Sequence, residues 1–305
     1  MFMMKIAILG GSGFIGKELA KHLIDLGYEV EIWSRNPERS GSITDAVATS
    51  SIAVKKWPLD RSKDYQDIEV VVNLAGETIN QRWTKQAKQR ILSSRVETTR
   101  SVIEEIQAGT ISPKVLINAS AVGFYDTSVD QSFTEEDGPG DDFLAQVTSA
   151  WEQEADKAKE YGVRVVKTRF GVVLGKGDGA LPRMILPYKL FAGGPVGSGK
   201  QWVAWIHSRD IVGLIQFAIE NPSIEGALNC TAPQTVQMNQ FGHIVGKVMK
   251  RPHWLPVPSF ALKILLGEMS DLVLKGQRVT PEKALKGGYN FTHPELESAL
   301  EVLLK

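Results

Sequence analysis

A glycine-rich turn between a predicted strand and a predicted helix is the feature that most constrains the fold. Apolar residues 6–9 run directly into Gly10-Gly11-Ser12-Gly13-Phe14-Ile15-Gly16, and an amphipathic helical pattern follows. Gly10 can supply the tight turn, Gly13 the close approach of a diphosphate, and Gly16 the room for the helix to pack on the strand. The backbone N–H groups that open the helix, around Phe14 and Ile15, favour an anion. The turn therefore predicts a dinucleotide-binding unit.

The composition limits the classes of function. The chain has 305 residues, which suits a large α/β domain with a subdomain. Lys plus Arg and Asp plus Glu both number 35, so no global field draws in nucleic acid or an anionic membrane. A single cysteine, Cys230, excludes an internal disulfide framework and a thiolate metal cluster. We expect a cytoplasmic protein that recognises a small molecule, without a metal site, and a second copy of the chain is a candidate partner.

Apolar strands that alternate with helices predict a parallel sheet covered on both faces. After the first strand, strands are expected at 28–33, 52–57, 70–74, 115–119 and 163–168, with helices at 85–106 and 143–160. Residues 123–142 are rich in Gly, Asp and Ser and are expected to form a long loop. The predicted fold class is α/β, a doubly wound parallel sheet of the Rossmann type.

The sequence changes character beyond Phe170 and predicts a smaller substrate-side part. Residues 171–199 carry eight glycines and three prolines, which interrupts the alternation of strand and helix. We expect residues 1–170 with 205–235 to bind the dinucleotide, and residues 171–204 with 236–305 to form the C-terminal substrate subdomain. A helix is expected at 211–220 with Asp210 as its N-cap, and a mostly helical tail begins at about residue 238.

The charge after the second strand indicates which dinucleotide is bound. An NAD site usually places Asp or Glu about 20 residues beyond the glycine turn, to bind the ribose diol. Here the strand ends in Ser34 and Arg35, and Arg39 follows one helical turn later. Both arginines could hold a 2′-phosphate with charge-assisted bonds, which predicts NADP. The alternatives are a solvated basic loop, and Glu31 as the diol acid if the strand ended early.

A further wall of the cofactor site is expected at the end of the strand at 70–74. Leu74, Ala75 and Gly76 lie at the carboxyl edge of the predicted sheet, where ligands bind in open α/β folds. Three residues just after this edge could bind an anionic or ring-shaped substrate: Glu77, Arg82 and Trp83. The alternative for these three is a loop-packing tryptophan beside an exposed ion pair.

Several motifs together resemble the extended short-chain dehydrogenase/reductase superfamily, in its NAD-dependent epimerase/dehydratase branch. They are the glycine turn, Asn73-Leu74-Ala75-Gly76 and the stretch from Ala119-Ser120 to Phe124-Tyr125. Ser94-Arg95-Val96, Trp205 to Asp210, and the run from Leu266-Gly267-Glu268 to Pro281 are similar to the "epimerase family protein" group, which carries a C-terminal domain of unknown function. The resemblance implies oxidoreductase or epimerase chemistry on a small polar molecule, with a sugar-like one as a candidate.

The superfamily's usual acid/base pair, a Tyr and a Lys four residues later, is missing from the matching helix. One register places Leu144 and Thr148 at these positions, and a shift of two residues places Gln146 and Ala150 there. Tyr125 is the nearest remaining phenol, so it is predicted to be the acid/base, with Ser120 as its orienter. The alternatives are Tyr125 as a structural anchor, Ala121 in place of Ser120, and an NADP(H)-binding regulator that catalyses no reaction. For His207 we favour a structural role beside a helix cap.

Overall fold

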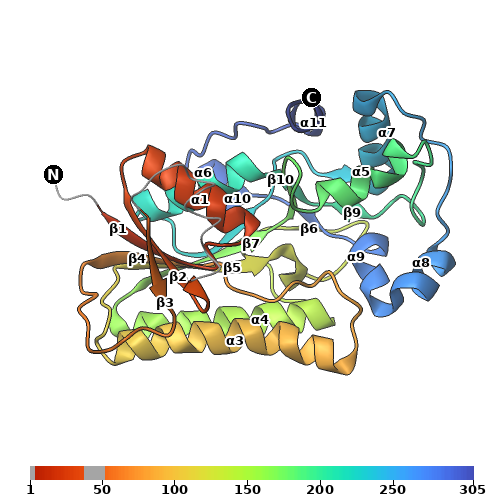
Figure 1. The fold of residues 1–305 in the computed structure, drawn as a ribbon. Coiled ribbons are helices and arrows are strands. Elements are labelled where there is room, and N and C mark those ends of the chain that lie inside the picture. The colour runs from red at the N-terminus through yellow and green to blue at the C-terminus, as the bar shows by residue number, and fades with distance from the viewer. Residues whose placement is uncertain (1–3, 38–51) are drawn as a thin grey trace.

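A computed structural model describes residues 4–37 and 52–305 and shows a doubly wound parallel sheet (Figure 1). Among the described residues, seven parallel strands follow the order β11-β7-β5-β4-β1-β2-β3. They are β1 (Lys5–Leu9), β2 (Glu29–Ser34), β3 (Ala53–Lys56), β4 (Ile68–Asn73), β5 (Val115–Ala121), β7 (Arg164–Phe170) and β11 (Gly226–Cys230). The strand order reverses between β1 and β4, and ligands of open α/β sheets bind at the carboxyl ends of the strands beside this point. The predicted fold class is confirmed.

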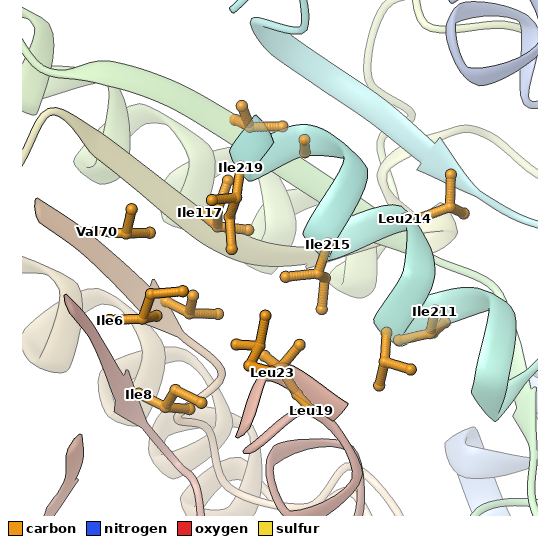
Figure 2. Packing of buried hydrophobic residues seen from close by; sticks show 14 of the residues in the cluster. Ile6, Ile8, Leu19, Leu23, Val70, Ile117, Ile211, Leu214, Ile215 and Ile219 are labelled. Carbon is orange, nitrogen blue, oxygen red and sulfur yellow. The ribbon is translucent and has the colours of Figure 1, made fainter. Parts of the chain in front are cut away.

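Helices cover both faces of the sheet because each strand alternates between two apolar faces. Ile6 and Ile8 of β1 pack with α1 (Phe14–Asp25) and α6 (Ser208–Glu220), as Figure 2 shows. Ala7 and Leu9 belong to a second core, which contains residues of α3 (Lys85–Gln107). The helix α4 (Phe143–Asp156) lies beside α3 on that face (Figure 1). Helices therefore cover both faces of the sheet, and a ligand site is expected at the carboxyl ends of the strands.

The remaining elements lie outside the large sheet. In the described part of the chain they include three small sheets, which pair β8 (Val172–Leu174) with β10 (Trp205–His207), β9 (Trp202–Val203) with β12 (Val236–Gln237), and β6 (Ser132–Phe133) with β13 (Arg278–Val279). The helices are α5 (Leu181–Lys189), α7 (Met238–Met249), α8 (Ser259–Leu266), α9 (Asp271–Leu274), α10 (Glu282–Lys286) and α11 (Leu296–Leu304), with short 3₁₀ helices η2 (Val122–Phe124), η3 (Lys157–Tyr161) and η4 (Gly267–Ser270). The division of the chain into two parts at the expected boundaries stays a prediction.

Two expected helix boundaries differ from the structure. The α-helical part of the segment expected at 143–160 ends at Asp156, and the chain continues as η3. α6 begins at Ser208 because His207 caps it: the Nδ1 atom of His207 accepts the backbone N–H of Arg209 at 3.0 Å. Asp210 lies inside the first turn instead, where its carboxylate accepts the N–H groups of Thr292 and His293. The N-cap prediction for Asp210 was therefore wrong, because its side chain is used to dock the C-terminal segment.

Within residues 4–37 and 52–305, no helix combines the length and the hydropathy that a membrane-spanning segment requires.

The core between α6 and the sheet predicts the cost of a cavity. Ile215 has 0% exposure, whereas Ile264 is 77% exposed. We expect Ile215→Ala to lower the free energy of unfolding by about 2–5 kcal/mol, since it removes buried methyl groups and leaves a void. The matched change Ile264→Ala should stay within about 0.5 kcal/mol of the parent protein. Urea denaturation measures both, and equal losses would contradict this assignment of the core.

Candidate functional site

The glycine turn brings two backbone segments into contact at the carboxyl edge of the sheet. Gly10 has a φ of +77°, and a Cβ atom there would lie 2.8 Å from the carbonyl carbon and oxygen of Leu74. A Cβ atom on Gly16 would lie 2.5 Å from the carbonyl oxygen of Gly10. No side chain caps α1, whose N-cap is Gly13, so the N–H groups of its first turn at Phe14 and Ile15 are available to an anion. The turn has the geometry of an anion-binding helix start.

Two contacts around this turn were not expected from the sequence. The ring of Phe14 lies against Gly175 and Gly179, so that a Cβ atom on either glycine would meet it. A Cβ atom on Gly11 would lie 2.8 Å from the side chain of Ile32 in β2. The loop after β8 therefore packs on the side chain of Phe14, and a spacing pattern in the sequence could not reveal this long-range packing.

The end of β4 is held by a buried amide network. Asn73 donates from Nδ2 to the hydroxyl of Thr99 at 2.9 Å and to the Oδ1 atom of Asn118 at 2.8 Å. The Oδ1 atom of Asn73 accepts the backbone N–H of Ala75 at 3.2 Å, and the N–H of Leu74 donates to the carbonyl of Leu9 at 2.9 Å. These bonds orient the segment from Leu74 to Gly76 beside the glycine turn, where the sequence predicted a wall of the site.

Arg95 contacts the segment at Gly76 and Glu77, and the sequence analysis did not assign it to the site. Its Nη1 atom donates to the carbonyl oxygens of Ile91 and Glu77, both at 3.0 Å. Its guanidinium also lies against Gly76, where a Cβ atom would be 3.1 Å from Cζ. Burial lowers the pKa of Arg95 to about 10, and the structure shows no ion pair for it within the described residues. Arg95 thus brings a cation without a bonded carboxylate to the edge of the site.

The end of β2 has the features expected for a 2′-phosphate site. The hydroxyl of Ser34 accepts the backbone N–H of Asn36 at 3.2 Å, and Arg35 follows as an exposed residue. Glu31 is buried within the strand, where its carboxylate pairs with Lys5 at 3.0 Å, so it is engaged away from the strand end. This contact disfavours the alternative of Glu31 as a diol ligand. Arg39 lies outside the described residues.

Two of the three residues predicted to bind substrate, Glu77 and Trp83, are engaged by neighbouring residues. Glu77 accepts hydrogen bonds from Gln81 and Arg90, which together with the nearby charge of Arg35 lower the pKa of its carboxyl. Trp83 is buried against Phe143, with ring centroids 5.2 Å apart, and its Nε1 atom donates to the carbonyl of Ile79 at 2.9 Å. Trp83 therefore has the loop-packing role that was the alternative to substrate stacking, whereas Arg82 is exposed.

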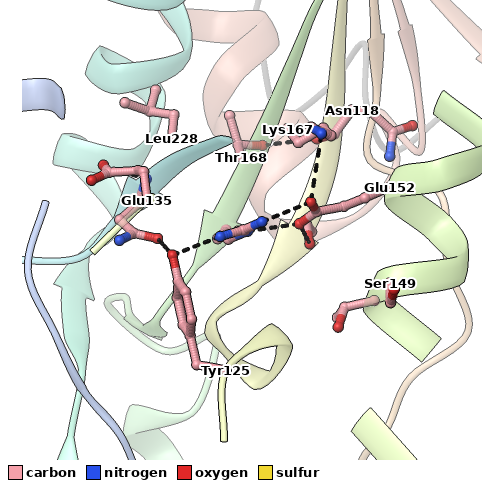
Figure 3. Close-up of polar contacts among 12 residues, drawn as sticks. Asn118, Tyr125, Glu135, Ser149, Glu152, Lys167, Thr168 and Leu228 are labelled. Carbon is pink, nitrogen blue, oxygen red and sulfur yellow. Dashed lines mark hydrogen bonds and ion pairs between the residues drawn. The ribbon is translucent and has the colours of Figure 1, made fainter. Parts of the chain in front are cut away.

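Tyr125 is fully buried and belongs to a polar network inside the protein (Figure 3). Its hydroxyl donates to the Oδ1 atom of Asn229 at 2.7 Å and accepts from the Nη1 atom of Arg169 at 2.7 Å. Its ring stacks on Phe133 at 5.3 Å. Burial raises the pKa of Tyr125 to about 12, although the charge of Arg169 opposes this. The geometry argues against the predicted acid/base role, because the side chain has 0% exposure and its hydroxyl is already used both as a donor and as an acceptor.

Ser120 belongs to the same network. Its hydroxyl donates to Glu152 of α4 at 2.7 Å, and it is almost completely buried. Glu152 also accepts from Arg169, at 2.8 Å and 2.9 Å, so that the two charges form a bidentate pair. Figure 3 shows Glu152 extending from its helix into this network. Ser120 therefore orients Glu152 rather than Tyr125, which argues against its predicted role as orienter of the phenol.

The structure favours one of the two registers considered for α4. Leu144 contacts the 3₁₀ helix after β5, where a Cβ atom on Gly123 would lie 3.2 Å from the Cβ atom of Leu144. Thr148 is buried one turn later, and its hydroxyl donates to the carbonyl of Leu144 at 2.8 Å. Gln146 is exposed. The face of α4 toward the sheet therefore presents Leu144 and Thr148, neither of which offers an ionisable group.

The buried network predicts a structural effect of removing the phenol. Tyr125→Phe leaves Arg169 and Asn229 each without one partner in a buried setting, so the free energy of unfolding should fall by about 1–3 kcal/mol. The matched change Tyr161→Phe, at an exposed tyrosine, should have an effect within about 0.5 kcal/mol. Denaturant titration provides the measurement. If Tyr125→Phe were as stable as Tyr161→Phe, the structural role would be refuted.

Comparisons with known proteins agree with this architecture. The family model of the NAD dependent epimerase/dehydratase family matches residues 6–230, and the model of a domain of unknown function, DUF1731, matches residues 257–303. The epimerase family protein YfhF of Bacillus subtilis is 46% identical over 305 residues, which cover 99% of this chain and 98% of that protein. A chloroplastic epimerase family protein of Arabidopsis thaliana is 40% identical and covers 99% of this chain and 87% of its own length.

Solved structures show the same similarity. The crystal structure of human epimerase family protein SDR39U1 (isoform2) with NADPH has a TM-score of 0.87 and 33% identity, and covers 98% of this chain and 99% of that chain. UDP-glucuronic acid 4-epimerase from Bacillus cereus in complex with NAD shares the fold, with a TM-score of 0.78 at 19% identity, and covers 98% of this chain and 96% of that chain. The chain therefore belongs to the NAD-dependent epimerase/dehydratase family and carries that family's Rossmann-type sheet together with the DUF1731 domain.

Proposed function

We propose that this protein is a cytoplasmic NADP(H)-dependent oxidoreductase or epimerase of the extended short-chain dehydrogenase/reductase type. The substrate in this proposal is a small polar molecule, with a sugar-like one as a candidate. The observation that carries the proposal is the glycine turn beside Leu74, where the first turn of α1 has no side-chain cap and its N–H groups can bind a diphosphate. A relative of 33% identity was crystallised with NADPH, which supports the choice of cofactor.

The residues present fit a nicotinamide dinucleotide phosphate. The uncapped first turn of α1 would hold the diphosphate, and the backbone from Leu74 to Gly76 would line the dinucleotide. Arg35 is exposed at the end of β2, where a guanidinium suits a 2′-phosphate and an acidic residue would repel it. When bound, the nicotinamide supplies a hydride donor or acceptor. Arg95 would keep Gly76 in place through its bond to the carbonyl of Glu77.

The second candidate function is an NADP(H)-binding protein without turnover. The observation that favours it is that three hydroxyl groups on or near α4 already donate hydrogen bonds inside the protein. The hydroxyls of Ser120, Tyr125 and Thr148 donate to Glu152, to Asn229 and to a backbone carbonyl, respectively. Catalytic roles for Tyr125 and Ser120 are therefore not part of the favoured proposal. A bound dinucleotide would then act as a sensed ligand rather than a redox partner.

Arg35 gives a direct test of cofactor choice. Arg35→Ala should weaken NADPH binding by about 1.5–3 kcal/mol, tenfold or more, because a charge-assisted bond to the 2′-phosphate is lost. NADH binding should change little. Arg61→Ala is the matched control, since Arg61 pairs with Glu105 on another part of the chain. Fluorescence titration of the parent protein and both variants with each cofactor measures the six affinities. An equal loss for NADPH and NADH would refute the role of Arg35, and no binding of either cofactor would refute the proposal.

Turnover distinguishes the two candidate functions. Purified protein is mixed with NADPH, and separately with NADP, against a library of carbonyl compounds, alcohols and nucleotide sugars, and the absorbance of NADPH is followed. An oxidoreductase should change this absorbance with at least one compound, at a rate that depends on protein concentration. An epimerase returns the hydride in each turnover and leaves the absorbance unchanged, so the nucleotide sugars are also analysed by NMR for a new stereoisomer. A protein that binds NADPH and gives neither result with any compound would favour the regulatory alternative. Gly16→Leu, which blocks the start of α1, is the control without a cofactor site.

A further inference from the structure

The helices α5, α7 and α8 lie at the same end of the molecule (Figure 1), and exposed apolar side chains are concentrated in α5 and just after it, in the segment before α8, and in α8 itself. Of the thirteen exposed large hydrophobic side chains among the described residues, eight fall within residues 186–265. We call these eight the α5–α8 surface, and they are Leu186, Leu190, Phe191, Trp254, Leu255, Phe260, Ile264 and Leu265. α8 contributes the most exposed of them, with 68% for Phe260, 77% for Ile264 and 73% for Leu265, and the helix has no buried residue. Ala261, Leu262 and Leu266 are partly buried, so one side of α8 packs on the protein while Phe260, Ile264 and Leu265 remain exposed.

Backbone contacts join the parts of this surface. Nε1 of Trp254 donates to the carbonyl of Phe191 at 3.0 Å, and the N–H groups of Trp254 and Leu255 both donate to the carbonyl of Gly193. The guanidinium of Arg251 lies 4.2 Å from the centre of the Phe191 ring. Pro258 then leads directly into α8. The end of α5 and the segment before α8 therefore run side by side, and their exposed side chains form one surface rather than scattered positions.

The charge of this region differs from that of the whole chain. Residues 179–209 and 226–267 contain eight Lys and Arg and no Asp or Glu, although the two charges balance at 35 each over the full sequence. Lys189, Lys250, Arg251 and Lys263 belong to the elements that carry the α5–α8 surface, and none of them forms an ion pair with another described residue. The balanced total on which the expectation of no membrane contact rested therefore conceals a local positive field.

This charge indicates the kind of partner. A twofold interface between two copies would place the surface, with its unpaired Lys and Arg, against itself, and like charges would repel. An anionic lipid surface is complementary in both respects, because it attracts the cations and accepts the apolar side chains at the boundary of headgroup and acyl chain. Lys and Arg can lay their aliphatic stems along the apolar surface while the charges reach lipid phosphates. Tryptophan is also favoured at such interfaces.

We infer that the α5–α8 surface docks the protein peripherally on anionic phospholipid, with α8 lying in the plane of the interface. Eight residues of helix span about 12 Å, so α8 is suited to lie on a bilayer and not to cross it. Phe260, Ile264 and Leu265 would enter the interface, while Lys189 and Lys263 would contact the headgroups. The inference goes beyond the proposed function and does not depend on it, because none of these residues was placed in the dinucleotide site.

Sedimentation with lipid vesicles tests the inference on the full chain. The protein is mixed with vesicles of phosphatidylcholine and phosphatidylglycerol in equal amounts, and separately with phosphatidylcholine alone. We expect binding to the anionic vesicles that falls as salt is raised, and at least about tenfold weaker binding to the neutral ones. Ile264→Gln with Leu265→Gln should reduce binding by about tenfold or more, since apolar area is lost from the interface. Lys189→Gln with Lys263→Gln should reduce it by about 25-fold, because each lysine near the surface contributes about fivefold.

Matched variants separate this from general effects of hydrophobicity and charge. Leu285→Gln with Val302→Gln removes two exposed apolar residues elsewhere, and Lys56→Gln with Lys85→Gln removes two exposed lysines elsewhere. Both should bind like the parent protein. Absent binding to anionic vesicles, equal binding to neutral ones, or equal loss in the control variants would overturn the inference. Light scattering in lipid-free buffer tests the alternative that a second copy of the chain covers this surface. A dimer of the parent protein that is abolished by Ile264→Gln with Leu265→Gln would also overturn the inference. NADPH titration of the same samples reports separately on the proposed function.

Discussion

The close approach of Gly10 to the end of β4 is the contact on which the rest of the site depends. Two backbones meet there with no space for a Cβ atom, so the start of α1 lies directly beside Leu74 and Ala75. Because the strand order reverses between β1 and β4, this contact is also where the sheet opens at its carboxyl edge. The Asn73 network then holds β4 in this position through Thr99 and Asn118. A precise backbone approach and an uncapped helix start thus arise from the same packing.

A buried ion pair replaces the acid/base pair of the superfamily as the organising feature of α4. Arg169 and Glu152 are both almost inaccessible, and the remaining donors and acceptors of the pair are satisfied by Ser120 and Tyr125. A pair of this kind adds little net stability, but removing one partner leaves a buried charge uncompensated, which costs about 3–5 kcal/mol. The side chains that could have carried proton transfer are therefore committed to keeping the charges satisfied. A function that binds the dinucleotide without turnover is therefore a physical alternative to an enzymatic one.

Net charge and local charge lead to different expectations for this chain. The equal totals of 35 suggested no attraction to charged surfaces, and that holds only as an average over the sequence. Lys189 and Lys263 are separated by more than seventy positions, and the bond of Trp254 to Phe191 joins the chain just after α5 to the segment that leads into α8. Folding therefore concentrates charge that the composition dilutes. The same folding leaves α8 with its apolar side chains outside the core.

The class of fold is encoded in the sequence, because the periodicity of apolar residues and the glycine turn are local signals. The positions of β1, α1 and β5 and the room for packing at Gly16 follow from neighbours along the chain, whereas the contact of Gly10 with Leu74 joins residues that are far apart in the sequence. Tertiary structure alone decided that Tyr125 is buried against Asn229, which lies more than one hundred positions later, and that Asp210 docks Thr292 rather than capping α6. It also decided that Trp83 packs on Phe143, and that Arg95 lies beneath Gly76. A side chain's type states which bonds it can form, but its partners are set by the long-range packing that brings distant segments together, and this packing leaves no periodic trace in the sequence.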